Sequence, residues 1–235
     1  MSKTKKAYYL RFIARIIVLI ISILLYFIKP EYFSIVNGFG IFKEFNVLSI
    51  IYLIWIVDII IQNLPISNYL SIGTLKQHKK YMQKTNISLA SIKKLILKQV
   101  NSTKSAFKIF IIWMAGLFLV GYLYWTNIIG IKEIFIMCCI FYVCDLICVL
   151  FFCPFQKFFL HNKCCATCRI FNWDHIMMFS PFVYVVGFYS LSLFVLSLAS
   201  MIIWEINHLL HMERFSDETN ASLQCKNCKE RMCRR

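Results

Sequence analysis

The sequence has few charged residues, few glycines and few prolines, and these shortages limit what the chain can be. Only 16% of its 235 residues are charged and 60% are hydrophobic. Soluble domains average about 25% charged and about 45–50% apolar residues, so the composition indicates an integral membrane protein. The 7 glycines and 4 prolines, beside abundant Ile, Lys, Asn and Phe, are typical of an AT-rich genome such as that of a low-GC bacterium.

The motifs of several protein classes are also missing. We find no P-loop, no dinucleotide-binding glycine pattern, no His-Glu-x-x-His and no Gly-x-Ser-x-Gly. We also find no inverted repeat, which disfavours a secondary transporter. The net charge is +15, but no nucleic-acid-binding motif accompanies it. Because the basic residues lie between apolar runs, we expect membrane lipids as partners and no nucleic acid.

Several apolar runs approach the roughly 18–20 residues that a helix needs to cross a bilayer. They predict an all-α, polytopic bundle of about five transmembrane helices. No small-residue cleavage site follows the first run, so we interpret it as an uncleaved span with a cytoplasmic N-terminus. The expected spans are residues 10–28, 47–61, 106–125, 134–152 and 181–204, which make residues 1–204 the transmembrane domain. Residues 205–235 form a polar, Cys-containing tail.

A basic segment before the third span has the pattern of an amphipathic helix. In residues 89–104, apolar side chains recur every three or four positions with lysines opposite them. This cytosolic helix either lies on an anionic membrane surface or packs on another cytosolic element, and both alternatives stay open. The distribution of basic residues favours a cell-membrane protein with its N-terminus inside. With five spans, the loop at 153–179 is then cytosolic and the tail is outside. A re-entrant loop would place both on one side, and the sequence leaves this alternative open.

The loop at 153–179 is rich in cysteine. A Cys-x-x-Cys pair can place two thiolates on one metal ion, and a neighbouring Cys or His can complete a tetrahedral set. Because soft thiolates select such metals, we expect zinc or an iron–sulfur cluster. The alternative is a reduced loop whose cysteines only pack. The expected ligands are Cys153, His161, Cys164, Cys165 and Cys168.

The last span and the tail carry a second group of candidate residues. Cysteines among basic residues are expected to have lowered pKa values and reactive thiolates. A Glu-x-x-His-x-x-His run covers one broad helix face, but we prefer to interpret it as a polar interfacial turn anchored by Trp204. The members of this second group are Cys225, Cys228, Cys233, Glu205, His208 and His211.

Two carboxylates lie inside apolar runs, Asp58 and Asp145, and such groups usually face a cavity or a partner. Helical spacing puts Cys138, Asp145 and Cys148 on one face of the fourth span. This ladder could relay thiol–disulfide exchange, or it could be a packing face with one functional carboxylate.

The residues therefore support three hypotheses about function. The first is a membrane protein for redox or metal handling that binds a metal or cluster in the loop. The second is a transmembrane thiol–disulfide oxidoreductase that uses the tail cysteines and those of the fourth span. The third is a non-catalytic scaffold or small-solute permease. A protein partner or a homo-oligomer is compatible with each of them.

Overall fold

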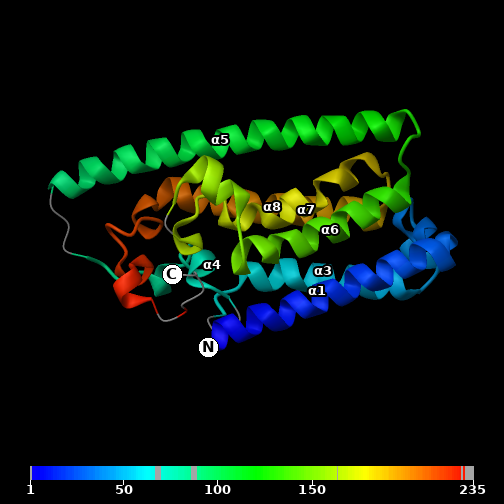
Figure 1. The fold of residues 1–235 in the computed structure, drawn as a ribbon, viewed down its shortest axis with the longest axis horizontal. Coiled ribbons are helices and arrows are strands. Elements are labelled where there is room, and N and C mark those ends of the chain that lie inside the picture. Colours follow the sequence, from blue (N-terminus) through cyan, green and yellow to red (C-terminus); the bar gives the residue numbers. More distant parts are fainter. Residues whose placement is uncertain (1, 67–69, 86–88, 163, 229, 231–235) are drawn as a thin grey trace.

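The computed structural model describes residues 2–66, 70–85, 89–162, 164–228 and 230, and the regular elements in these ranges are helices (Figure 1). Four helices are long and apolar enough to cross a membrane, and a fifth apolar helix is shorter. The predicted all-helical bundle is therefore confirmed. The long helices are α1 (Lys3–Ile28), α5 (Leu89–Trp125), α6 (Ile131–Leu150) and α8 (Phe188–Leu210), and the shorter one is α3 (Val47–Asn63).

Short helices fill the connections between these five. They are η1 (Pro30–Val36), α2 (Gly40–Lys43), α4 (Ile72–Leu75), η2 (Lys79–Tyr81), η3 (Gln156–Leu160), η4 (Cys165–Thr167), η5 (Phe171–Trp173), α7 (Asp174–Phe179), η6 (Ser180–Tyr184), η7 (Met212–Arg214), η8 (Ala221–Leu223) and η9 (Cys225–Asn227). Of these, η3 is a single π-helical turn.

Polar caps define where two of the apolar helices begin. The Asn46 side chain accepts a hydrogen bond from the backbone N–H of Leu48 at 2.9 Å, and Ser49 completes the capping box at the start of α3. The Ser2 hydroxyl accepts from the N–H of Lys5 at 3.1 Å and starts α1 in the same way. Such caps satisfy backbone donors that the first helical turn leaves unpaired.

The predicted amphipathic segment and the third span form one continuous helix, α5. Its 37 residues correspond to a length of about 55 Å, well beyond the roughly 30 Å of a bilayer core. Figure 1 shows α5 along the outside of the bundle. In its polar half, Ile92, Ile96 and Val100 are 44%, 53% and 45% exposed. The lysines of this half contact the tail, since Lys94 pairs with Glu218 and Lys98 pairs with Asp217, so both alternatives stay open.

An aromatic core fills one half of the bundle. Trp55 of α3 is completely buried, and its ring centroid lies 5.2 Å from that of Phe135 and 5.1 Å from that of Phe179. Phe182 and Tyr189 complete the cluster from η6 and α8. Close packing of this kind leaves little free space between the helices.

The segment at 174–187 runs along the whole of α3 in the opposite direction. At one end, the Gln62 amide donates to Asp174 Oδ1 at 2.7 Å. At the other end, the backbone of Gly38 pairs with that of Val186 and Phe188, through N–O distances of 2.8 and 2.7 Å. The last long helix starts only at Phe188, not near residue 181. We call the end of the bundle at Gly38 the far end.

Glycine is required where these chains meet at the far end. A Cβ atom on Gly187 would lie 2.2 Å from the carbonyl oxygen of Val36. Gly38 has a φ of 57°, in the left-handed region that glycine adopts at little cost. This close approach fixes the turn between η6 and α8.

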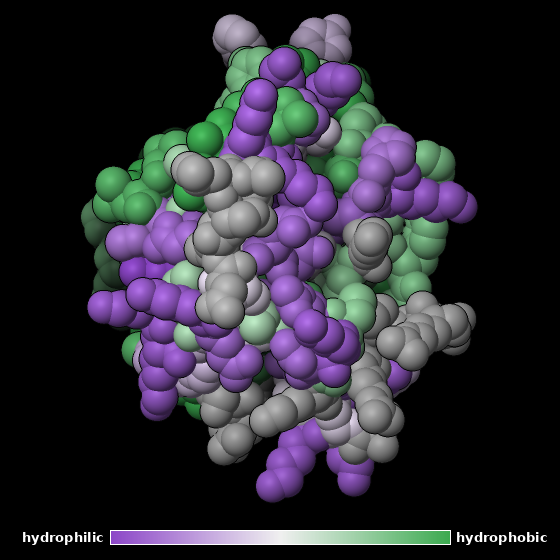
Figure 2. All heavy atoms as spheres, turned by 90° about the vertical axis from the view of Figure 1, so that its left-hand side faces the viewer, coloured by the Kyte–Doolittle hydropathy of each residue, from purple (hydrophilic) through white to green (hydrophobic). Residues whose placement is uncertain are grey.

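Because the segment at 174–187 returns to the far end, the central loop and the tail lie at the same end of the bundle. The Ser2 hydroxyl donates to the carbonyl of Glu230 at 2.6 Å, and the Trp204 indole donates to the carbonyl of Arg169 at 2.9 Å. The structure thus brings together two segments whose relative placement the sequence left open. We call this the termini end, and Figure 2 shows that hydrophilic side chains gather on it.

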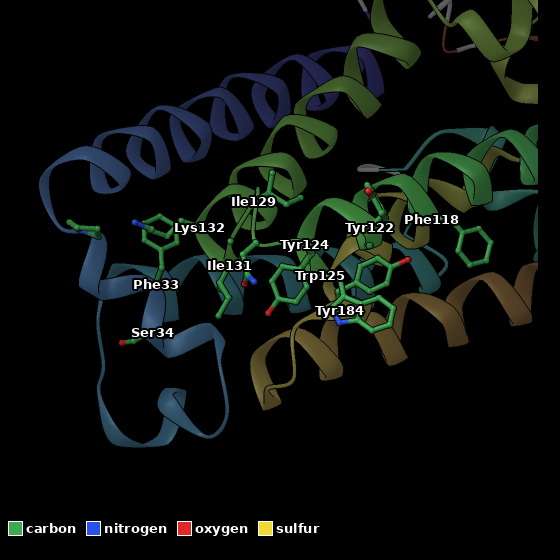
Figure 3. A pocket seen from close by; sticks show the side chains of 14 residues that line it. Phe33, Ser34, Phe118, Tyr122, Tyr124, Trp125, Ile129, Ile131, Lys132 and Tyr184 are labelled. Carbon is green, nitrogen blue, oxygen red and sulfur yellow. The ribbon is translucent and has the colours of Figure 1, made fainter.

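An open aromatic groove lies at the far end (Figure 3). Its volume is about 1150 Å³, and Phe118, Tyr122, Trp125 and Tyr184 are among the side chains that line it. Trp125 and Tyr122 are 87% and 62% exposed, as expected for residues of an interfacial aromatic belt. The groove is lined by no Cys, His or carboxylate of the described residues.

Candidate functional site: a charge cluster beside a thiol cavity

Arg15 is an arginine buried between three helices. It is 4% exposed, and its Nη2 lies 2.9 Å from Asp58 Oδ2 of α3. Its Nη1 lies 2.5 Å from Asp145 Oδ2 of α6 and donates to the carbonyl of Tyr142 at 2.8 Å. The guanidinium carbon stands 4.0 Å from the centroid of the Tyr142 ring. One cation thus holds two carboxylates that are far apart in the sequence.

A histidine of α7 extends this network. His175 Nε2 lies 3.8 Å from Asp58 Oδ2, and its Nδ1 lies 3.4 Å from Asp174 Oδ2. The side chains of His175, Asp58 and Asp174 are 3–14% exposed. We name the five ionisable residues from α1, α3, α6 and α7 the charge cluster. It consists of Arg15, Asp58, Asp145, Asp174 and His175.

The charge cluster explains why two carboxylates are tolerated in apolar helices. Taking a charge out of water costs several kcal/mol, and the attraction of a well-placed opposite charge offsets about as much. The sequence analysis identified Asp58 and Asp145 but missed the cation between them, Arg15. The signal was present, because Arg15 lies inside the first apolar run, where a basic residue is unusual. Asp174 and His175 gave no such signal, because they follow an irregular loop.

A small cavity adjoins the charge cluster. Its volume is about 130 Å³, and it lies between α5, α6, α7 and the central loop. Asp145 and Asp174 form part of its wall, together with apolar side chains such as Trp113 and Met178. We name it the thiol cavity because five cysteines line it. They are Cys144, Cys148, Cys153, Cys165 and Cys168.

Two of these thiols, Cys148 and Cys153, are hydrogen-bonded to each other. The bond from Cys148 lowers the pKa of Cys153, against the effect of burial, to about 7. The backbone N–H of Gln156 also donates to Cys153 Sγ, at 3.4 Å. In contrast, burial raises the pKa of Cys168 to about 11. A thiolate near neutral pH is therefore favoured at Cys153 and disfavoured at Cys168.

The structure divides the five predicted metal ligands between different surroundings. Cys153, Cys165 and Cys168 line the thiol cavity, whereas His161 lines a separate groove. Cys164 Sγ accepts from the N–H of Ala166 at 3.4 Å, which caps η4. No group of three or more His, Cys, Asp or Glu in the described part of the chain has an arrangement that could hold a metal ion. Metal binding therefore stays a prediction.

The second group of candidates does not converge on one point either. Glu205 accepts from Arg169 through both carboxylate oxygens and from the Trp173 indole at 2.7 Å. The buried His208 packs against the Phe215 ring, at a centroid distance of 4.9 Å. The remaining members are more accessible: Cys225 is exposed, His211 and Cys228 are half-buried, and Cys233 lies outside the described residues.

The predicted cysteine ladder of the fourth span is only partly assembled. Asp145 and Cys148 line the thiol cavity, but Cys138 is completely buried in the aromatic core. Its neighbour Cys139 donates to the Ser22 hydroxyl of α1, with an S–O distance of 3.4 Å. Only the last turns of the predicted ladder therefore line the cavity.

Comparisons with protein-family models, curated proteins and solved structures find no match to this chain.

Proposed function

We propose that this chain is a membrane dithiol–disulfide oxidoreductase, in which Cys153 attacks the substrate and Cys148 resolves the intermediate. The observation that carries the proposal is the hydrogen-bonded pair of thiols in the thiol cavity. Two sulfurs in hydrogen-bond contact need little movement to form a disulfide. The lowered pKa of Cys153 supports its role as the nucleophile, since the thiolate is the attacking species.

The reaction consists of two exchanges with a substrate disulfide R–S–S–R. In the first, the Cys153 thiolate forms a bond to one substrate sulfur and expels the other as a thiolate. In the second, Cys148 loses its proton and attacks Cys153 Sγ, which releases the second thiolate. The substrate gains two electrons, the protein ends with a Cys148–Cys153 disulfide, and the leaving thiolates take up protons.

Asp145 is our candidate for the group that takes up the Cys148 proton. It lies three residues before Cys148 on α6, a spacing that makes two side chains neighbours on a helix, and both line the thiol cavity. Its ion pair with Arg15 fixes the position of this carboxylate. The role of the remaining charge cluster is then to support Asp145.

The direction of electron flow follows from the orientation that we propose. At the far end, the described segments carry only three basic residues, Lys29, Lys43 and Lys132. The other basic residues belong to the bundle and to the termini end, so the positive-inside rule places the termini end in the cytoplasm. Because cytosolic thiols are kept reduced, the resting protein would be a dithiol that reduces disulfides.

Trapping the intermediate tests the proposal. The full chain, purified in detergent and reduced, is incubated with glutathione disulfide, and disulfide-linked peptides are mapped by mass spectrometry. We expect a Cys148–Cys153 disulfide in the unmodified chain and a glutathione adduct on Cys153 in Cys148→Ala. The matched control, Cys144→Ala, changes another thiol of the same cavity and should behave like the unmodified chain. An adduct spread evenly over the cavity cysteines would refute the assignment.

Zinc or iron–sulfur binding is the second candidate. It is favoured by the shared position of Cys153, Cys165 and Cys168 on one cavity wall. Anaerobically purified protein would then contain stoichiometric zinc or show visible absorption. Loss of that signal in the double variant Cys165→Ser/Cys168→Ser would favour metal binding. If the cysteine variants leave both the metal content and the glutathione reaction unchanged, a non-catalytic scaffold or permease is the better interpretation.

A further inference from the structure

A second groove, smaller than the aromatic groove but larger than the thiol cavity, opens at the termini end. Its volume is about 640 Å³, and it lies between the polar half of α5, the central loop and the tail. Cys168 is the only cysteine among the described residues that line it. The proposed oxidoreductase chemistry does not use this groove, so its function must be argued separately.

Three buried nitrogen-bearing side chains line the groove. Lys76 is 1% exposed, its Nζ donates to the carbonyls of Ala166 and Cys168 at 2.9 and 2.7 Å, and the ammonium stands 5.1 Å from the Trp204 ring centroid. Arg169 uses its Nη atoms on Glu205, but its buried Nε has no partner among the described residues. The Nδ1 of His208 is likewise buried and unpartnered within the described chain.

Lys76, Arg169 and His208 thus bring buried nitrogen atoms to one groove, and the buried Oδ1 of Asn162, which also lines it, is likewise unpartnered within the described chain. Burying a donor without an acceptor is costly, and proteins seldom leave several such donors together. The two carboxylates that line the groove do not serve them, because Glu218 pairs with Lys94 and Asp217 pairs with Lys98. Burial also lowers the pKa of Lys76 to about 7, with Arg169 contributing. An anion in the groove would reverse that effect.

The surroundings of the groove indicate where the anion comes from. Leu97 of α5 lines it and is 63% exposed, and its neighbours Ile96 and Val100 are also exposed. The same helix continues into the apolar run that could cross a membrane. An anion with long apolar chains would place its charge in the groove and its chains along this face of α5.

We propose that this groove binds the phosphate of an anionic membrane phospholipid, with Lys76, Arg169 Nε and His208 as the donors. The acyl chains lie along the exposed apolar side chains of α5. The proposal does not depend on the thiol chemistry, since the two sites use different side chains.

Lipid competition measured by native mass spectrometry tests this proposal. The delipidated full chain in detergent is mixed with equal amounts of phosphatidylglycerol and phosphatidylcholine. We expect about tenfold more phosphatidylglycerol adduct, and a loss of about fivefold in Lys76→Gln. The matched control, Lys80→Gln, removes an exposed lysine of the same segment and should leave the adduct unchanged.

A variant that fills the groove and a comparison with inorganic phosphate complete the test. Ser102→Trp fills the groove from α5 without removing a Lys76 contact, so it should abolish the phosphatidylglycerol preference even if Lys76→Gln folds poorly. Equal binding of both lipids, or equal loss in Lys80→Gln, would overturn the proposal. If inorganic phosphate alone stabilises the chain against heat as much as phosphatidylglycerol, the ligand is a soluble anion and the lipid assignment is wrong.

Discussion

Replacing Arg15 by Gln is the most direct test of the charge cluster. The substitution removes the one cation that holds both Asp58 and Asp145, at 2.9 and 2.5 Å. Breaking a buried ion pair by removing one partner costs roughly 3–5 kcal/mol, because the remaining charge stays buried and uncompensated. Here two carboxylates are left facing each other. We therefore expect a loss of about 4–5 kcal/mol, a large share of the roughly 5–15 kcal/mol that stabilises a typical protein.

Removing the carboxylates as well should restore much of this loss. In Arg15→Gln combined with Asp58→Asn and Asp145→Asn, no unpaired charge remains at this point of the bundle. Replacing a whole buried ion pair is often close to neutral, so we expect the triple variant to recover more than half of the lost free energy of unfolding. Such non-additivity is the measure of a direct interaction between neighbouring residues.

The measurement is the free energy of unfolding in mixed detergent micelles, from denaturant titrations followed by tryptophan fluorescence. Arg11→Gln is the matched control, because Arg11 lies one turn earlier on α1 and forms no ion pair among the described residues. Equal losses in Arg15→Gln and Arg11→Gln, or no recovery in the triple variant, would show that the buried ion pairs do not carry this stability.

Three further predictions concern the thiol cavity, the attachment of α5 and the topology. The pH at which the rate of Cys153 alkylation by iodoacetamide reaches half of its maximum should be near 7. In Cys148→Ala this pH should rise toward the ordinary thiol pKa of about 8.5. An unchanged value would contradict the hydrogen bond between the two thiols. Gly121→Leu should lower the free energy of unfolding in detergent by about 1–3 kcal/mol, because a Cβ atom there would lie 2.4 Å from the ring of Tyr184 in η6. Gly116→Leu should lower it far less, because the space around Gly116 is open. A membrane-impermeant maleimide should label Cys225 and a single reporter cysteine in the central loop from the same side of the membrane, and labelling from opposite sides would exclude the fold described above.

The sequence predicted that some of the loop cysteines lie together, but not which ones. Cys153, Cys165 and Cys168 do line one cavity, as their clustering suggested. His161 and Cys164 do not, because a π-helical turn and a capped 3₁₀ turn place them on other surfaces. Distances in sequence cannot reveal how such short irregular turns orient side chains.

The sequence by itself determined the helical class and the approximate positions of the five apolar helices. A continuous apolar run is a local property, and its length alone decides whether a helix can cross a bilayer. Only the tertiary structure decided that Arg15 joins two carboxylates and that the tail returns to the central loop. The second depends on the segment at 174–187, whose 6-residue helix and 5-residue 3₁₀ turn are far shorter than the runs that hydropathy detects. Its direction is set by contacts at its two ends, with Gln62 and with Gly38, and such contacts exist only after the helices have packed.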